Sequence, residues 1–458
     1  MAIGEARAKA FEGLFGEGDE RMTDLAALAE ALEAPAATDP ILKRHVAAAV
    51  IGNGLEFYDF ITYATFAVPI AHTFFPNHSP FVSEMLSLAT FGAGFIPRPI
   101  GAILIGRYAD RVGRKPAMIF SFTLMGLAIL GLALTPSFAQ IGVAAPILAV
   151  SWRLLQGFAL GGEVGPTTAF LIEAAPPDKR AIYAVWQNIS QNLASMGGGL
   201  VGVTMAAVVG ATLLEAWGWR VAFLIGAVTL PVGFWLRRSL PETLHRASAA
   251  TGAHPDSARL LSHVRIFLIG LGLVAAGTVS TYVFAYMTTY AITTLHLPTG
   301  ISLSVSIVTG SISIVGGVAG AFLSDRFGRR PLLIWPRLAF LLATWPAFHL
   351  MVQNHDAVTL LVANGVLAAI GSFMGASLIV GVAESIHKDM RGMGLGTVYA
   401  TAVAVFGGTT QPVIHWLIHV THDPLAPGWY MMAFTCVGLV ASLFFGESAH
   451  RRLSPLAA

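Results

Sequence analysis

Long apolar stretches separated by short polar loops constrain this 458-residue chain more than any other feature. A hydrocarbon core of about 30 Å needs about 20 apolar residues to span it as a helix. Charged residues make up only 11% of the chain, whereas about a quarter of the residues of a soluble domain are charged. The sequence therefore predicts an all-α polytopic membrane protein. Its twelve predicted spans are roughly 46–70, 82–106, 116–135, 142–172, 183–211, 218–236, 265–291, 299–323, 331–351, 358–384, 393–419 and 428–446.

A short basic loop occurs twice between apolar stretches. Residues 106–115 read GRYADRVGRK and residues 321–330 read AFLSDRFGRR, so Asp110 and Asp325 lie 215 positions apart. An offset near half the chain length indicates duplicated halves, which is how many secondary transporters are built. The predicted segments are an N-terminal tail at 1–44, a six-helix half at 45–237, a linker at 238–263, a second six-helix half at 264–447 and a C-terminal tail at 448–458.

The repeated loop resembles the signature of the major facilitator superfamily, Gly-x-x-x-Asp-Arg-x-Gly-Arg-Arg/Lys, except that Ala321 replaces glycine in the second copy. The resemblance implies twelve helices in two pseudo-symmetric halves, which give access to a central cavity from each side in turn. We predict a cytoplasmic gate in which Glu163, Glu173 and Arg180 pair with Asp110, Arg111 or Arg114. The second copy of the loop adds Asp325, Arg326 and Arg329 as gate candidates. Glu384 and Arg391 are also candidates, because they repeat the seven-residue spacing of Glu173 and Arg180.

The positions of lysine and arginine predict the orientation of the chain. These residues crowd the loops after even-numbered spans, whereas the loops at 72–81, 136–141, 292–298, 352–357 and 420–427 carry none. Cytoplasmic loops carry the excess of positive charge. We therefore predict a protein of the cell inner membrane with both termini in the cytoplasm. The net charge of +2 gives no reason to expect a nucleic-acid partner, and one cysteine cannot form an intrachain disulfide.

Two carboxylates stand in the first span. Glu56 and Asp59 are three positions apart and so lie on one helical face. A charge at that depth is costly unless it is paired or faces water, so it marks a pathway by default. We predict that Asp59 carries the transported proton, with Glu56 as a second candidate. The alternative for Glu56 is that it only braces a neighbouring helix near the cytoplasmic mouth.

Two arginines stand inside later spans. Arg98 lies between Pro97 and Pro99, and Arg153 lies near the middle of the fourth span. A fixed cation in the membrane is what an anionic substrate requires. Arg98 could instead satisfy carbonyls freed by the prolines. If Arg153 meets Asp59, the pair could take up and release a proton as solvent access changes, or it could be a permanent structural ion pair.

Other polar groups in the spans are candidates for lining a cavity. Gln187 and Gln191 follow helical spacing in the fifth span, and Tyr286 belongs to a row of three tyrosines in the seventh. Tyrosines at that depth also occur simply as interfacial anchors. Arg337 is expected to snorkel or to brace the cytoplasmic loop. His349 and His415, near the outer surface, are expected to be satisfied or exposed histidines rather than proton carriers.

These residues narrow the resemblance to one family within the superfamily. The sequences GNGLEFYDF at 52–60, RPIG at 98–101 and RLLQG at 153–157 are similar to the metabolite:proton symporter family, whose members import carboxylates, betaines and related metabolites. The stretches at 70–76, 91–95, 345–347 and 404–408 are most similar to citrate and tricarballylate symporters. The stretch GGEVGP at 161–166 departs from that type, and the chain lacks the long C-terminal coiled coil of the betaine and proline members.

The resemblance implies a proton-coupled symporter that imports an organic carboxylate and works as a monomer without cofactor or metal. Arg98 and Arg153, with Gln187, Gln191 and Tyr286, are the predicted substrate-binding residues, and Asp59, Glu56 and Arg153 the predicted coupling residues. The alternatives are a dicarboxylate, 2-oxoglutarate or shikimate as substrate, and export or exchange on the same fold. A non-transporting membrane sensor is disfavoured by the intact paired loops. The sequence shows no nucleophile paired with a base and no metal-ligand spacing, so we do not expect an enzyme.

Overall fold

The computed structural model describes residues 43–112, 114–161, 171, 175–176, 179–239, 257–385 and 391–447. Helices account for nearly all of these residues, and the described ranges contain no strand, which confirms the predicted all-α class. Backbone groups in lipid have no water to bond, so a helix, which satisfies them internally, is the form that a spanning segment takes.

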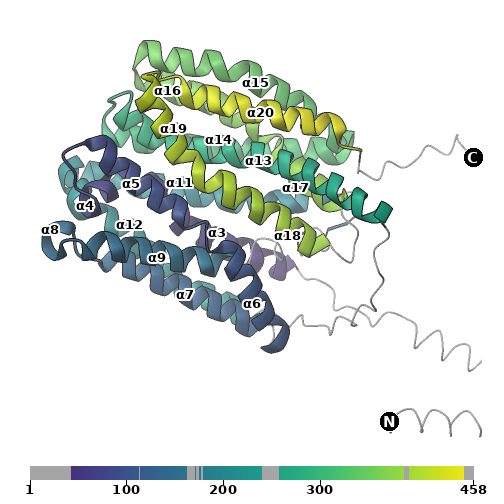
Figure 1. Ribbon diagram of the computed structural model, residues 1–458, viewed down its shortest axis with the longest axis horizontal. Coiled ribbons are helices and arrows are strands. Elements are labelled where there is room, and N and C mark those ends of the chain that lie inside the picture. Colours follow the sequence, from purple (N-terminus) through teal and green to yellow (C-terminus); the bar gives the residue numbers. More distant parts are fainter. Residues whose placement is uncertain are drawn as a thin grey trace, which may run out of the picture. The chain divides into compact units, whose positions relative to one another are not determined.

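The helices fall into two groups, one before and one after the gap at 240–256, called here the first half and the second half. In Figure 1 the purple to blue helices of the first half lie together, and the green to yellow helices of the second half lie together. The first half comprises α3 (Lys43–Thr65), α4 (Ala67–Phe74), α5 (Pro80–Ala93), α6 (Arg98–Val112), α7 (Arg114–Leu134), α8 (Phe138–Ile141), α9 (Ala144–Leu160), α11 (Arg180–Leu213), the π-helix η1 (Leu214–Gly218) and α12 (Trp219–Ser239). The second half comprises α13 (Ser257–Thr293), α14 (Thr299–Phe327), α15 (Arg329–Asn354), α16 (Ala357–Ser372), α17 (Gly375–Ser385), α18 (Arg391–Ala402), the π-helix η3 (Val403–Gly407), α19 (Gly408–Thr421) and α20 (Ala426–Phe444).

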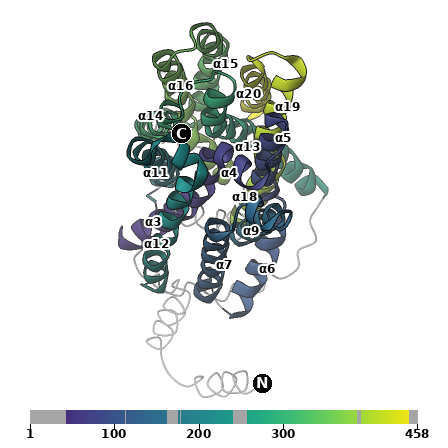
Figure 2. The same cartoon turned by 90° about the vertical axis from the view of Figure 1, so that its left-hand side faces the viewer.

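Several helix pairs join the halves, among them α11 with α14, α5 with α19 and α11 with α17. Helix α11 of the first half packs along α14 of the second, and α5 packs on α19. Figure 2 shows α11 and α14 side by side, and α5 beside α19. A Cβ on Gly92 of α5 would lie 2.2 Å from the carbonyl oxygen of Gly408, and one on Gly310 of α14 would lie 2.7 Å from that of Asn192. Small residues let helices in lipid approach this closely.

The helical stretches do not correspond one to one with the predicted spans. Among the described residues, seven stretches are long and apolar enough to cross a membrane, and two shorter apolar helices cover 119–134 and 144–160. One stretch, Arg180–Val228, covers most of two predicted spans, because α11, η1 and α12 follow one another without a loop. The turn between those spans is made by Gly210, whose φ of +81° is a left-handed conformation that favours glycine. The count of twelve stays a prediction.

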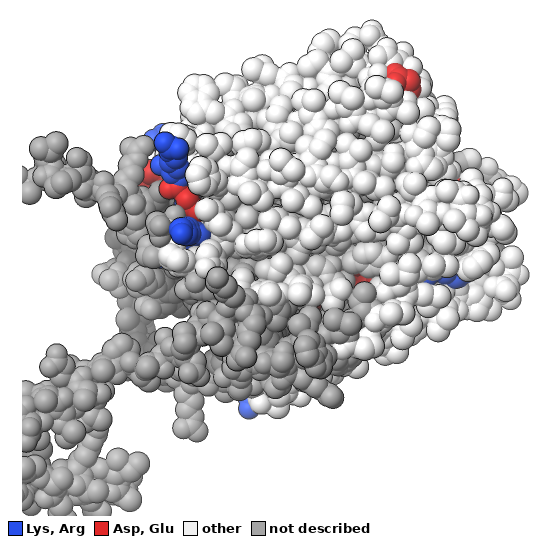
Figure 3. Space-filling model, turned by 180° about the vertical axis from the view of Figure 1, so that it is seen from behind, with Lys and Arg blue, Asp and Glu red and all other residues white. Residues whose placement is uncertain are grey.

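The surface agrees with a position in lipid. Figure 3 shows a face that is almost bare of charged side chains, with most of its visible charges gathered at one end. Large apolar side chains are exposed along the helices, for example Leu134 at 69%, Val228 at 74% and Trp335 at 67%. Exposed apolar area of this extent is what a lipid-facing surface requires. The predicted linker at 238–263 is partly helical, because α13 begins at Ser257.

Aromatic side chains fill the first half near the second. Phe60 of α3 packs on Phe91 and Phe95, with ring centroids 4.8 and 5.1 Å apart, and Phe95 reaches Tyr282 of α13 at 5.2 Å. Edge-to-face and tilted pairs of this kind stabilise a core beyond the burial of their area. This cluster, called here the aromatic wall, is formed by Phe60, Phe91, Phe95 and Tyr282, of which Tyr282 also lines the cavity described next.

Candidate functional site

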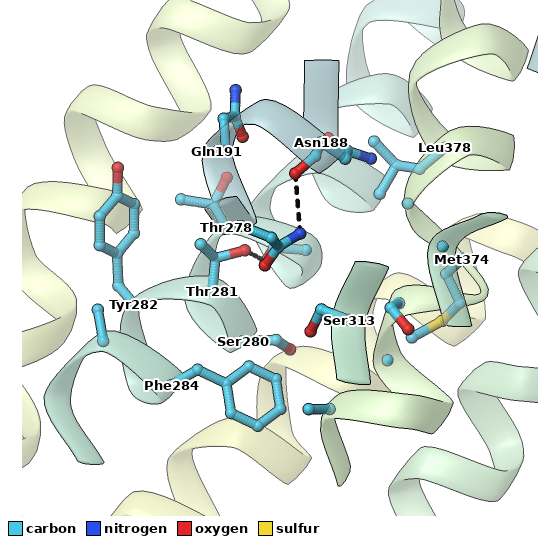
Figure 4. Close-up of a pocket in the computed structure, with 18 of the residues that line it drawn as sticks. Asn188, Gln191, Thr278, Ser280, Thr281, Tyr282, Phe284, Ser313, Met374 and Leu378 are labelled. Atoms are coloured by element: carbon cyan, nitrogen blue, oxygen red, sulfur yellow. Dashed lines mark hydrogen bonds between the residues drawn. The ribbon is translucent and has the colours of Figure 1, made fainter. Parts of the chain in front are cut away.

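A polar cavity of about 240 Å³ lies between the two halves. Figure 4 shows its amides, Asn188 and Gln191 of α11, facing the hydroxyls of Thr278 and Thr281 of α13. Helices α3, α14, α15 and α17 also contribute, so both halves enclose the space. A cavity with many hydrogen-bonding groups and apolar walls suits a small polar solute. Its polar lining includes Gln187, Asn188, Gln191, Asn192, Ser195, Thr278, Ser280, Thr281, Tyr282, Ser306, Thr309, Ser313, Ser372, Tyr399 and Thr435.

One cation lines this cavity among the described residues, and the sequence did not assign it there. Arg337 of α15 is 1% exposed, and its Nη1 donates to the carbonyl oxygens of Gly438, at 3.0 Å, and Leu333 and to Oγ of Ser442. Its Nη2 is buried without a hydrogen-bond partner. The expectation that Arg337 snorkels is wrong, because α20 holds the guanidinium inside the protein.

Arg98 lies behind the wall of the cavity rather than in it. Its guanidinium stands 4.1 Å from the ring centroid of Phe95 and 4.6 Å from that of Phe60. It also lies against Tyr282 and Tyr399, both of which line the cavity. Stacking on aromatic faces stabilises a buried arginine through cation–π attraction. In this conformation Arg98 thus lies next to the cavity lining but is not part of it.

Arg153 is held among aromatic rings on the first-half side. Its guanidinium lies 4.4 Å from the ring centroid of Tyr63, 4.9 Å from Phe60 and 5.1 Å from Phe91, and it donates to Oε1 of Gln156. The side chain is 1% exposed. Neither Arg153 nor these aromatic neighbours line the cavity.

Asp59 does not meet Arg153. Among the described residues Asp59 forms no ion pair, and its Oδ1 is buried without a hydrogen-bond partner. The carboxylate faces α12, where a Cβ on Gly226 would lie 1.8 Å from Oδ1. Phe60 points to the arginines, and the next residue along a helix is turned by about 100° from its neighbour. The conditional pairing of Asp59 with Arg153 is therefore absent from this conformation. Glu56, one turn earlier, is also buried at 4% exposure.

The tyrosine row divides between two environments. Tyr282 lines the cavity, as do the predicted Gln187 and Gln191. Tyr286 does not line it, because this side chain is fully buried with its hydroxyl 2.9 Å from Nδ1 of His415. A spacing of four residues rotates a helix position by about 40°, which is enough to move Tyr286 out of the cavity wall.

One contact at the predicted cytoplasmic gate joins the halves. Arg180, at the start of α11, binds Glu384 of α17 at 3.2 Å, whereas the predicted partners were Asp110, Arg111 and Arg114. Those three residues belong to the first half with Arg180, so pairing with them would not join the halves. Arg326 and Arg111 are exposed. The side chains of Asp110, Arg114 and Arg391, and all of Glu163 and Glu173, lie outside the described residues.

Asp325 connects the same contact to the backbone of α11. Its two carboxylate oxygens accept from the N–H groups of Ala181 and Ile182 at 3.0 and 3.1 Å. The first N–H groups of a helix have no partner within it, and the helix dipole favours an anion there. Arg329 then bridges Asp325 at 2.6 Å and Glu384 at 3.3 Å. A second-half charge network thus binds the first turn of a first-half helix.

The family model described as Major Facilitator Superfamily matches residues 49–412. The chain belongs to the major facilitator superfamily. This major facilitator protein is 36% identical over 397 residues to the citrate-proton symporter of Salmonella typhi, a match that covers 85% of this chain and 91% of the relative. It is 35% identical to the citrate-proton symporter of Klebsiella pneumoniae, covering 86% and 89%, and 32% identical to the alpha-ketoglutarate permease of Escherichia coli K12, covering 86% and 91%.

Solved structures share the fold of this major facilitator protein. The crystal structure of a D-xylose-proton symporter matches it with a TM-score of 0.70 at 19% identity, covering 89% of this chain and 98% of the other. A partially occluded inward-open structure of the xylose transporter XylE from E. coli also matches at 0.70, with 17% identity and coverage of 90% and 99%. These likenesses show that the chain shares their fold. The match to the family model is what confirms the predicted superfamily.

Proposed function

We propose that this protein is a proton-coupled symporter that imports a citrate-like organic carboxylate across the cell inner membrane. It acts as a monomer, because one chain supplies both halves and the whole cavity. Both of its termini lie in the cytoplasm. Like its relatives, the chain is a transporter and not an enzyme. Similarity over most of the chain to two citrate-proton symporters supports this substrate class.

The observation that carries the proposal is a cation with an unbonded nitrogen, Nη2 of Arg337, beside a cavity enclosed by both halves. No Asp, Glu or Lys is among the described residues that line the cavity, whereas Arg337 lines it with Nη2 unbonded. A guanidinium presents donors in a plane that matches a carboxylate. Gln187, Gln191 and Tyr282 supply further donors to carboxylate and hydroxyl oxygens. Behind this wall, the positive charges of Arg98 and Arg153 add to the attraction for an anion.

Asp59 is the proposed proton carrier. A carboxylate that is 2% exposed and has an unbonded oxygen is costly as an anion and stable as a neutral acid, so it favours a proton. Glu56, on the same helix, is the second candidate, and Arg153 adjusts the potential along α3. Coupling requires that proton and substrate each bind one access state better than the other, since equal affinities would shift nothing.

Two of the contacts between the halves give the alternation of access a physical form. The pairing of α5 with α19 closes one side of the cavity, and the network of Arg180, Asp325, Arg329 and Glu384 joins the halves at the other. Import requires these two contacts to be broken in turn, the first to admit substrate from outside and the second to release it into the cytoplasm.

The experiment that tests the proposal is uptake of labelled citrate into proteoliposomes under an imposed inward proton gradient. We expect uphill uptake that a protonophore abolishes and that tricarballylate inhibits. Arg337→Gln should raise KM about 10- to 100-fold, because a hydrogen bond to a charged group contributes about 1.5–3 kcal/mol. Arg265→Gln, on the exposed cytoplasmic end of α13, is the matched control and should leave KM unchanged. An equal KM for Arg337→Gln and wild type would contradict the proposed anion site.

A second substrate class is supported by the similarity to the alpha-ketoglutarate permease. The same proteoliposomes should therefore be supplied with labelled 2-oxoglutarate, succinate and shikimate in turn. Uptake of one of these in place of citrate would keep the mechanism and change the substrate. Accumulation that depends on a preloaded internal anion and not on the proton gradient would identify an exchanger instead.

A further inference from the structure

A buried cluster of titratable side chains joins the two halves away from the cavity. Glu84 of α5 is 8% exposed, His415 of α19 is 7% exposed, and Tyr286 of α13 is fully buried. Nε2 of His415 lies 3.5 Å from Oε2 of Glu84, and Nδ1 lies 2.9 Å from the Tyr286 hydroxyl. None of the three lines the cavity, and none is among the predicted coupling residues. The cluster therefore has no part in the substrate site described above.

Aromatic rings cover the cluster where α5 begins. The ring of Phe81 stacks on His415, with centroids 5.1 Å apart and an interplanar angle of 11°, and on His419 at 3.7 Å. Among the described residues, no Lys or Arg forms an ion pair with Glu84, so His415 is the positive partner available to it. The other titratable groups around the cluster are His419 on α19, Tyr290 on α13 and Asp423 beyond the end of α19.

The number of protons on the pair decides its net charge. With one proton, Glu84 and His415 are together neutral, whether the proton is on the carboxyl group or on the imidazole. With no proton the pair is a buried anion, and with two protons it is a buried cation. Burial in an apolar interface strongly favours the neutral pair. Nε2 of His415 has no hydrogen-bond partner at its 3.5 Å separation, so a small approach would join it to the carboxyl group.

We propose that Glu84 and His415 form a latch that binds one proton when the outer side closes. When α5 and α19 part, water reaches both side chains, which then titrate as separate groups. Above about pH 6.5 a solvated imidazole is neutral and a solvated carboxyl group is ionised, so the parted pair holds no proton. Closing then requires one proton, which comes from outside.

The sign of the pH dependence follows from this count. The closed state binds one more proton than the open state above about pH 6.5, so a fall in pH favours closure by up to tenfold per unit. Below about pH 6.5 the open state also holds its proton, and the dependence weakens. Tyr286 is a positioning residue, since its hydroxyl, 2.9 Å from Nδ1, holds the imidazole ring in place. The assignment of this side as the outer one rests on the proposed function.

The test measures closure directly and without substrate. Spin labels on cysteines at Asn77 and Gln353, which are exposed at the same end of the two halves, report their separation in the full chain in lipid nanodiscs with Cys436 replaced by serine. Between pH 6.5 and 8.5 the ratio of short to long distances should fall at least tenfold. Glu84→Gln, neutral at every pH, should remove this dependence, and Glu84→Asp should retain it. His349→Gln, a histidine stacked on Trp345 of α15, is the matched control and should retain the full dependence.

A full pH dependence in Glu84→Gln, or a flat profile in the wild type, would overturn the proposal. Tyr286→Phe should shift the midpoint without removing the dependence, which a merely structural contact would not produce. Because the distances are measured without substrate, the outcome is independent of the transport assay. Absence of citrate uptake with a pH-dependent distance would remove the proposed substrate and keep the latch, and the reverse result would remove the latch alone.

Discussion

The approach of Gly92 to Gly408 predicts that a single methyl group will hold the two halves apart. A Cβ at position 92 would lie 2.2 Å from the carbonyl oxygen of Gly408, and side-chain Cβ atoms essentially never approach closer than 3.0 Å. Since both groups belong to helix backbones, α5 and α19 must separate by about 0.8 Å or more. Overpacking of this kind costs about 1–3 kcal/mol. The closed state in Gly92→Ala should therefore lose about 5- to 150-fold in population relative to the open one.

The spin-label pair at Asn77 and Gln353 measures this shift, and Gly92→Ala should move the distribution to longer distances at every pH. Gly300→Ala is the matched control, since it adds a methyl group to another contact between the halves, where the nearest atom is Cβ of Ala206 at 3.8 Å. It should leave the distances unchanged. A wild-type distance distribution in Gly92→Ala, with unchanged thermal stability, would refute the reasoning.

Three further predictions follow from single contacts. Asp59→Asn should abolish uphill accumulation in proteoliposomes while counterflow exchange continues, and normal accumulation would disprove the carrier role. Arg180→Ala removes an ion pair between the halves. A cysteine introduced at position 181, where Ala181 is fully buried, should then react with maleimide about tenfold faster than in the presence of Arg180. An unchanged rate would rule out a role for this ion pair in holding the halves together. The carboxyl group of Asp356 accepts two hydrogen bonds from Thr359, which lower its pKa. Its stabilisation is present above the ordinary value of about 4 and is lost at lower pH, so Asp356→Ala should lower Tm at pH 7 but not at pH 3. An equal deficit at both pH values would contradict this assignment.

The sequence predicted the fold and two of the residues that line the cavity, because both depend on composition and local pattern. Apolar stretches of membrane-spanning length and the repeated loop were sufficient for the all-α class and the superfamily. The polar row on the fifth span placed Gln187 and Gln191 on a face that does line the cavity. Charges in apolar helices marked Asp59, Arg98 and Arg153, and all three are buried.

Distances between helices decided what the sequence could not. Arg337 was expected near the cytoplasmic loop, but α20 supplies acceptors that hold it inside, and no local pattern reports a neighbouring helix. The spacing of the seventh-span tyrosines could not tell which of them faces the cavity, and the structure shows that it is Tyr282. Arg180 finds its partner 204 residues away in the other half.

The sequence by itself determined that this chain spans a membrane as two related sets of helices with buried charges, because the bilayer imposes length and hydropathy on each segment separately. Only the tertiary structure decided which charges meet. Arg153 and Asp59 are separated by the rotation of α3, and Glu84 meets His415 through the packing of α5 on α19. Pairing between helices depends on rotation and crossing, and these are set by side-chain packing over the whole bundle.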